Sequence, residues 1–313
     1  MIPMVLRVVR FSVFMILFFS CTPAPEKKES SEETEIPNPQ QGYVIPELPD
    51  SMFFCGKVIH LIDEDIHEKL DRELLVNTFF QSATVQTIKR SNRYFPIIEP
   101  ILKKHGIPDD FKYLAVIESN LMQAVSPAGA QGFWQFMPTT AKEYGLLISN
   151  EVDERLNIEK STEAACAYLK LAHGELGSWD LAAASYNRGI GGVRQDMKWQ
   201  GTDNYFDTHM NAETGRYVYR ILAVKLIFED PEYYGYTIKK EELYEPFQTR
   251  SVEVKSSIGN LAEWALAKGI NYKILVKLNP WLLTNKLMLK GNTFHLQLPH
   301  ASTNLKPYQE YLN

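Results

Sequence analysis

Residues 108–138 read PDDFKYLAVIESNLMQAVSPAGAQGFWQFMP and combine a helix signal with a glycine-rich loop. Pro108 followed by Asp109 and Asp110 is typical of the first turn of a helix. An apolar run follows these acids and leads to Glu118. We therefore predict a helix that ends near Glu118 and is followed by a loop with glycine, aromatic and amide side chains.

Glu118 lies on the apolar face of this predicted helix. With 3.6 residues per turn, it shares a face with Phe111, Leu114 and Ala115. Partial burial should raise the pKa of its carboxyl group and leave a fraction protonated near neutral pH. Such a group can donate a proton to a glycosidic oxygen. The alternative is that Glu118 is only a surface charge at a helix end.

The loop after Glu118 has the composition of a sugar-binding surface. Gly129 and Gly132 reduce the bulk of a turn, and Gln135 offers two donors and an acceptor. Flat apolar faces for pyranose rings come from three aromatic residues: Trp134, Tyr186 and Tyr217.

Simpler interpretations of the same side chains remain open. The aromatic residues of the loop, Phe133, Trp134 and Phe136, could belong to the core. Gln135 and Asn187 could be helix caps or hydrogen-bonding struts.

Four ordered blocks resemble the soluble lytic transglycosylase family, and within it the membrane-bound type D branch. The blocks are Glu118-Ser119, then Ser126-Pro127-x-Gly129-Ala130-x-Gly132-x-x-Gln135-x-Met137-Pro138, then Tyr186-Asn187, and finally Glu213-Thr214-x-Arg216-Tyr217. The resemblance covers roughly residues 90–235. It departs from the family pattern at Ser185, where relatives have Ala, and one small residue replaces another there.

The resemblance implies roles for individual residues. Glu118 matches the catalytic acid of the family, and Tyr186 matches a tyrosine that faces it. The remaining positions are expected to bind the substrate, which the resemblance implies to be peptidoglycan: Ser126, Gln135, Met137, Asn187, Glu213 and Tyr217.

The resemblance also implies a mechanism. No second carboxylate accompanies Glu118 in the sequence, whereas glycoside hydrolases generally use two. In the family, the N-acetyl group of the substrate assists departure, and the C6 hydroxyl of muramic acid closes a 1,6-anhydro ring. Glu118 would act first as acid and then as base. Two alternatives remain: a hydrolytic muramidase with a distant second acid, and a wall-binding protein without activity.

Residues 1–20 are predicted to be a signal peptide. Arg7 and Arg10 precede an uncharged apolar run of about ten residues, which is too short for a spanning helix of about twenty. Ser20 before Cys21 resembles a bacterial lipobox, so we expect lipidation at Cys21 and attachment to the outer membrane, facing the periplasm. The alternative is a plain secretory signal with an incidental cysteine.

Residues 21–55 are predicted to be a disordered tether for this lipid anchor. The segment is rich in Pro, Glu, Ser and Lys and contains few large apolar side chains up to about residue 50. Such a tether would let an anchored enzyme reach the cell wall.

Composition argues against several other functions. The formal net charge of −5 and the lack of a basic patch disfavour a nucleic-acid partner. The seven His show no HExxH or Cys/His spacing, and no glycine loop follows a predicted strand, so we expect neither metal nor cofactor. Cys55 and Cys166 could pair in an oxidising compartment, but their sequence positions do not require it.

Residues 56–235 have helical periodicity almost throughout, and strand signals are nearly absent. We therefore predict a mainly α protein with a lysozyme-like helical domain whose central part covers about residues 90–235. The expected helices are 62–80, 81–93, 96–105, 158–176, 179–187, 190–198 and 213–229.

Residues 248–300 are predicted to form a second, small α+β domain. Strand signals at 251–254 and 293–298 flank helical signals at 260–268 and 273–278. This order resembles a LysM carbohydrate-binding module in degenerate form, since Gly259-Asn260 replaces the usual Gly-Asp and is displaced toward the helix. The module either binds glycan or is merely structural.

Overall fold

The computed structural model describes residues 45–303 and 305–311, and 52% of these described residues are helical. The mainly α class with a small α+β part is confirmed. The predicted signal peptide and Cys21 lie outside the described residues. Within the described ranges, no helix is both long and apolar enough to cross a bilayer.

A β-hairpin precedes the helices. Strand β1 (Ser51–Phe54) pairs antiparallel with β2 (Lys57–His60), and Phe54 and Ile59 are buried against the helical core. The end of the predicted tether, residues 51–55, is therefore structured. The backbone N–H of Cys55 donates a hydrogen bond to Asp110 (2.6 Å), so a contact with a distant residue holds this turn.

Two long helices follow, α1 (Glu64–Phe79) and α2 (Gln81–His105). The predicted break near residue 95 is wrong, because α2 continues through Pro96 and Pro100. Both prolines are exposed, so the carbonyl groups that lose an N–H partner can bind water, while Ile98 and Leu102 anchor the opposite face in the core.

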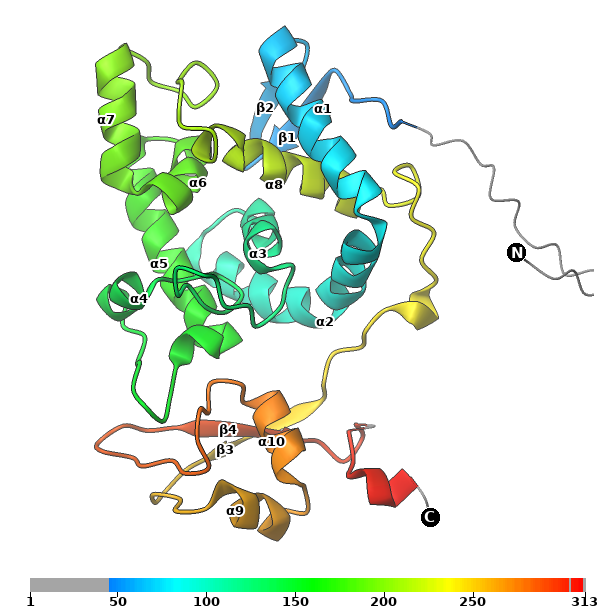
Figure 1. Cartoon of the computed structure of the whole chain (residues 1–313), viewed down its shortest axis with the longest axis vertical. Helices are drawn as coiled ribbons and strands as arrows, with labels where there is room; N and C mark the ends of the chain where they lie inside the picture. Colours follow the sequence, from blue (N-terminus) through cyan, green and yellow to red (C-terminus); the bar gives the residue numbers. More distant parts are fainter. Residues whose placement is uncertain (1–44, 304, 312–313) are drawn as a thin grey trace, which may run out of the picture. The chain divides into compact units, whose positions relative to one another are not determined.

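Helix α3 (Lys112–Ser119) lies in the middle of the helical domain, as Figure 1 shows. A single 3₁₀ turn, Asp109–Phe111, leads into it, so the predicted helix start is confirmed. Most of this short helix is buried, including Leu114, Ala115 and Val116. The end of α3 is therefore held from several sides.

The helices around α3 agree with the periodicity of the sequence. The pairs α2 with α5, α5 with α6, and α6 with α8 are in contact, and α8 also contacts α3. The remaining helices of this domain are α4 (Pro138–Glu143), α5 (Ile158–Leu176), α6 (Trp179–Arg188), α7 (Ile190–Gln200) and α8 (Thr214–Glu229). The side chains of Asn157 and Ser178 cap α5 and α6.

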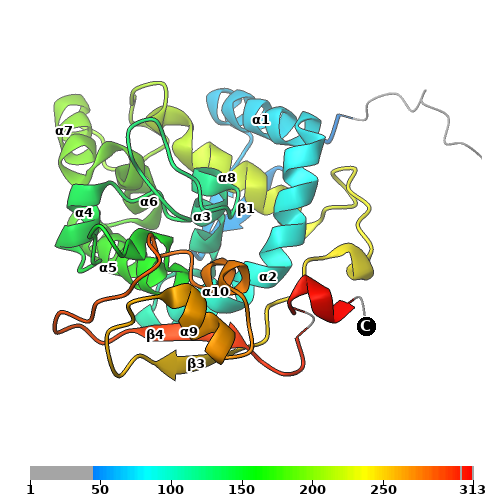
Figure 2. The same cartoon turned by 60° about the horizontal axis from the view of Figure 1, so that its bottom comes forward.

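The C-terminal module contains an antiparallel pair of strands, β3 (Thr249–Glu253) and β4 (His295–Pro299). Helices α9 (Leu261–Ala267) and α10 (Tyr272–Leu278) lie over this pair (Figure 2). The predicted order of strand, two helices and strand is confirmed. Val152, from the loop between α4 and α5, belongs to the same hydrophobic cluster as Leu275 and Leu296.

Candidate active site

Glu118 is the penultimate residue of α3 and is half-buried. The hydroxyl group of Tyr217, on α8, donates a hydrogen bond to its carboxylate. Tyr217 itself is fully buried, so its ring has no face open to a sugar. The expected stacking role of Tyr217 is therefore wrong, and its contact with Glu118 is through the hydroxyl group.

The pKa of Glu118 is raised above its ordinary value. Burial is the main cause, and the negative charge of Glu213 adds to it. The hydrogen bond from Tyr217 and the positive charge of Arg220 oppose the shift. The C-terminal end of α3 also disfavours a negative charge. The net effect is a raised pKa, which favours the neutral carboxyl group, the form that donates a proton.

Tyr186, on α6, connects the surroundings of Glu118 to the glycine-rich loop. Its hydroxyl group donates to the carbonyl oxygen of Trp134 (2.8 Å), and its ring packs edge-on against Phe136 (5.9 Å between centroids). Burial, followed by the negative charge of Glu118, raises the pKa of Tyr186 well above its ordinary value. Tyr186 is therefore a neutral donor that holds the loop.

The loop is fastened to α3 directly. The hydroxyl group of Ser119 is shared between the carbonyl oxygens of Ala115 and Phe133, 3.0 Å from each. Ser126 closes the first turn of the loop by accepting from the N–H of Ala130 (3.0 Å). Ser119, the residue next to Glu118, therefore fixes the distance between the end of α3 and the loop.

Two loop residues have structural roles that the sequence left open. Gln135 has a φ of 47°, and its side-chain amide donates to the carbonyl oxygens of Gly132 (2.7 Å) and Ala124 (3.0 Å), so it is a strut. Trp134 is fully buried, and its indole N–H donates to Thr162 (2.8 Å). Trp134 is therefore a core residue rather than a platform for sugar, and Phe133 and Phe136 are buried as well.

Arg155 is an anchor of the loop that the sequence analysis missed. Its guanidinium group donates to the carbonyl oxygens of Gly129 (2.8 Å) and Phe136 (3.1 Å) and pairs with buried Asp153 (2.6 Å). A Cβ atom on Gly132 would lie 2.0 Å from the carbonyl oxygen of Arg155. No motif marks Arg155, because its role depends on a segment about twenty residues away.

Asn187 and Glu213, two of the predicted site residues, form a polar group with Thr214 at the start of α8. The amide of Asn187 donates to Glu213 (2.9 Å), and its oxygen accepts from the hydroxyl group of Thr214 (2.7 Å). Glu213 is exposed, and Met137, at the start of α4, is 42% exposed. Glu118, Tyr217, Tyr186 and Glu213 interact electrostatically, whereas Met137 has no described link to them.

In the described part of the chain, no group of three or more His, Cys, Asp or Glu side chains is arranged to hold a metal ion. Cys55 and Cys166 are both free thiols, so the disulfide that the sequence allowed does not form.

Two segments match known domain families. Residues 95–208 match the transglycosylase SLT domain, and residues 250–302 match the soluble lytic transglycosylase C-terminal LysM-like domain. The first match contains Glu118 and the glycine-rich loop, and the second contains the β3–β4 pair.

Two curated relatives of the chain come from Escherichia coli. Membrane-bound lytic murein transglycosylase D of strain K12 is 29% identical over 180 residues, which is 55% of this chain and 39% of the relative. The protein of the same name from strain O6:H1 gives the same values. The chain therefore matches less than half the length of these relatives. A solved structure, an inactive mutant of lytic transglycosylase Slt from Pseudomonas aeruginosa, is 22% identical with a TM-score of 0.36, covering 56% of this chain and 33% of that one.

Replacing Gly132 by Ala should destabilise the protein by about 3 kcal/mol or more, because the new Cβ atom would clash with the backbone of Arg155. Gly129 is the matched control, since it also has a positive φ but open space around it. Gly129→Ala should cost only about 1 kcal/mol. Denaturant unfolding measures the free energy of unfolding of both variants. Equal losses of this free energy would contradict the predicted clash at Gly132.

Replacing Tyr217 by Phe should raise the pKa of Glu118 further, because the lost hydrogen bond stabilises the carboxylate. Glu118 would then lose its proton at a higher pH than in the unchanged protein. Carbon-13 NMR of the labelled carboxyl group measures this titration. Tyr219→Phe, also buried on α8, should leave it unchanged. An unchanged or lower pKa in Tyr217→Phe would contradict the assignment.

Proposed function

Since residues 95–208 form a transglycosylase SLT domain and residues 250–302 a C-terminal LysM-like domain, we propose that this protein is a peptidoglycan lytic transglycosylase. It would cleave the β-1,4 bond between N-acetylmuramic acid and N-acetylglucosamine. The observation that carries the proposal is the position of Glu118 in the SLT domain, half-buried, with a raised pKa and a buried tyrosine as partner.

In the first step, Glu118 donates its proton to the glycosidic oxygen. The bond between this oxygen and C1 of muramic acid breaks, and the glucosamine residue leaves with a hydroxyl group at C4. The N-acetyl group of muramic acid assists by bonding to C1. Burial prepares Glu118 for this step, because it raises the pKa of the carboxyl group and so favours the protonated form.

In the second step, the C6 hydroxyl group of muramic acid attacks C1, and the bond between C1 and the acetamido oxygen breaks, which restores the N-acetyl group. Its proton passes to the carboxylate of Glu118, so the acid is regenerated and a 1,6-anhydro ring forms without consumption of water. Between the two steps Glu118 is negatively charged. The hydrogen bond from Tyr217 and the positive charge of Arg220 both favour this charged form.

We further propose that exposed and half-buried residues near Glu118 bind the glycan strand. Met137 offers an exposed thioether, and Asn187 with Glu213 offers polar atoms at the start of α8. Ser126 and Gln135 lie in the loop, where each also makes hydrogen bonds to the backbone. Their contribution is therefore to shape the loop as well as to contact sugar.

A hydrolytic muramidase is the second candidate, and Glu213 is the observation that favours it. The charge of Glu213 acts on Glu118, so a second carboxylate is present in the surroundings of the acid. A hydrolase would use such a group to activate water. In this structure Glu213 accepts a hydrogen bond from Asn187, which supports a positioning role instead.

Muropeptides released from purified sacculi distinguish these candidates. We expect the unchanged protein to release products ending in 1,6-anhydromuramic acid, one water lighter than reducing ends. Glu118→Gln should reduce release by at least about a thousandfold, because the amide N–H is too weak an acid to protonate the glycosidic oxygen. Mass spectrometry measures both the amount and the type of end.

Glu213→Gln is the matched variant in the same assay. We expect it to keep anhydro products with a rate within about tenfold of the unchanged protein. Reducing ends that disappear with Glu213→Gln would establish the hydrolase instead. Near-normal release by Glu118→Gln would refute the mechanism, and binding to sacculi without any release would establish a wall-binding protein.

We also propose that the protein is an exported lipoprotein of the cell envelope, attached through Cys21 to the outer membrane and facing the periplasm. The signal-like residues 1–20 and the lipobox-like Ser20-Cys21 support this location. Cells fed a radiolabelled fatty acid should label the chain, and Cys21→Ser should lose the label. Equal labelling of both proteins would refute the anchor.

A further inference from the structure

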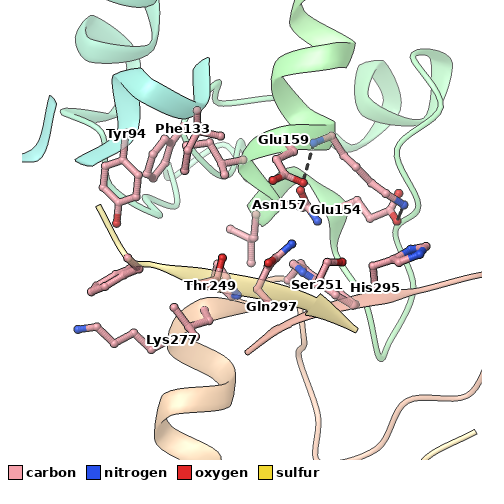
Figure 3. A pocket seen from close by; sticks show the side chains of 18 of the residues that line it. Tyr94, Phe133, Glu154, Asn157, Glu159, Thr249, Ser251, Lys277, His295 and Gln297 are labelled. Carbon is pink, nitrogen blue, oxygen red and sulfur yellow. Dashed lines mark hydrogen bonds and ion pairs between the residues drawn. The ribbon is translucent and has the colours of Figure 1, made fainter. Parts of the chain in front are cut away.

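A cavity of about 470 Å³ lies between the helical domain and the C-terminal module (Figure 3). Small-molecule sites commonly have volumes of about 300–1,000 Å³. Tyr94 and Phe133 line it from the helical domain, and strands β3 and β4 line it from the module. Glu118 is not among the residues that line it, so the cavity is distinct from the proposed active site.

The module presents the polar face of its strand pair to this cavity. Thr249, Ser251 and Gln297 point toward the helical domain in Figure 3, and Ser251 pairs with Gln297 across the strands. The opposite face carries Leu296 and Leu298, which are buried in the core of the module. The hydrogen bonds described for Gln297 use only its backbone, so its side-chain amide remains directed at the cavity.

One end of the cavity is positively charged. The guanidinium carbon of Arg93 lies 4.1 Å from the ring centroid of Phe247, and the Nζ atom of Lys277 lies 5.4 Å from the same centroid. Among the ion pairs of the described residues, none includes Arg93 or Lys277. Near the other end, buried Glu154 is paired with Lys160. Exposed Glu159 also lines the cavity, so the positive charges of Arg93 and Lys277 favour an anionic group at their own end of it.

Hydrogen bonds beside the cavity connect the helical domain to the C-terminal module. The N–H of Asp153 donates to the carbonyl oxygen of Trp281 (3.0 Å), and the N–H of Leu283 donates to that of Glu151 (3.0 Å). The carboxylate of Glu151 also accepts from the N–H of Met288 (3.0 Å). These bonds connect the loop before α5 to the module, so the two walls of the cavity are fixed against each other there.

From these features we propose that the cavity is a second glycan-binding site, which takes an N-acetylated sugar that carries a carboxylate. Resting on the proposed function, the ligand would be a peptide-free disaccharide of N-acetylglucosamine and N-acetylmuramic acid. The lactyl carboxylate binds Arg93 and Lys277, and the hydroxyl and acetamido groups bind the polar face of β3 and β4. Tyr94 provides an aromatic surface for a pyranose ring.

Isothermal titration of the full chain with this disaccharide tests the site. The ligand ends in muramic acid and lacks the bond that the proposed enzyme cleaves, so it stays intact. We expect Lys277→Glu to raise the Kd at least tenfold. Lys273→Glu, on the same helix but outside the cavity, should leave it within twofold. Both lysines are exposed, so neither change should affect folding.

Two further ligands test the role of the carboxylate. The same disaccharide with its lactyl carboxylate converted to an amide, and chitobiose, should each bind the unchanged protein at least tenfold more weakly. The proposal is overturned if Lys277→Glu and Lys273→Glu have the same Kd, or if the amide binds as tightly as the acid.

Muropeptide release measured on the same proteins separates this site from the proposed reaction. Binding that depends on Lys277 in a chain that releases no anhydro product supports the site and refutes the reaction. Normal release of anhydro products, together with disaccharide binding that does not depend on Lys277, refutes the second glycan site but not the reaction.

Discussion

The hydrogen bond from Tyr217 to Glu118 is the interaction on which the site depends. It joins the end of the central helix α3 to α8, two segments that are about a hundred residues apart in the chain. Burial and the negative charge of Glu213 raise the pKa of the carboxyl group, whereas Tyr217 and Arg220 lower it. The balance of these opposing effects lets one carboxyl group exist in both protonation states, which the proposed acid and base steps require.

The same helix end positions the loop that the substrate is proposed to contact. Ser119 donates to the carbonyl oxygen of Phe133, Tyr186 donates to that of Trp134, and Arg155 binds two further carbonyl oxygens. Each bond satisfies a backbone group of a loop that has little regular structure. Three separate segments therefore fix the loop, and Gly132 is required where the backbone of Arg155 passes close by.

The loop before α5 also connects the two parts of the described chain. Arg155 holds the glycine-rich loop, while Glu151, Val152 and Asp153, a few residues earlier, contact the C-terminal module. This short segment links the proposed active site and the proposed second glycan site. A ligand in the cavity would contact Phe133, whose carbonyl oxygen accepts from Ser119 next to Glu118.

The sequence by itself determined most of the helices, though not the continuity of α2 or the short α4, together with the order of elements in the C-terminal module and the apolar-face position of Glu118. These features follow from local periodicity, caps and turn residues, which act over a few neighbours. Only the tertiary structure decided that Tyr217 acts through its hydroxyl group, that Trp134 is buried, that Arg155 anchors the loop and that residues 51–60 form a hairpin. Each depends on contacts between segments far apart in the chain, and no local pattern encodes such contacts.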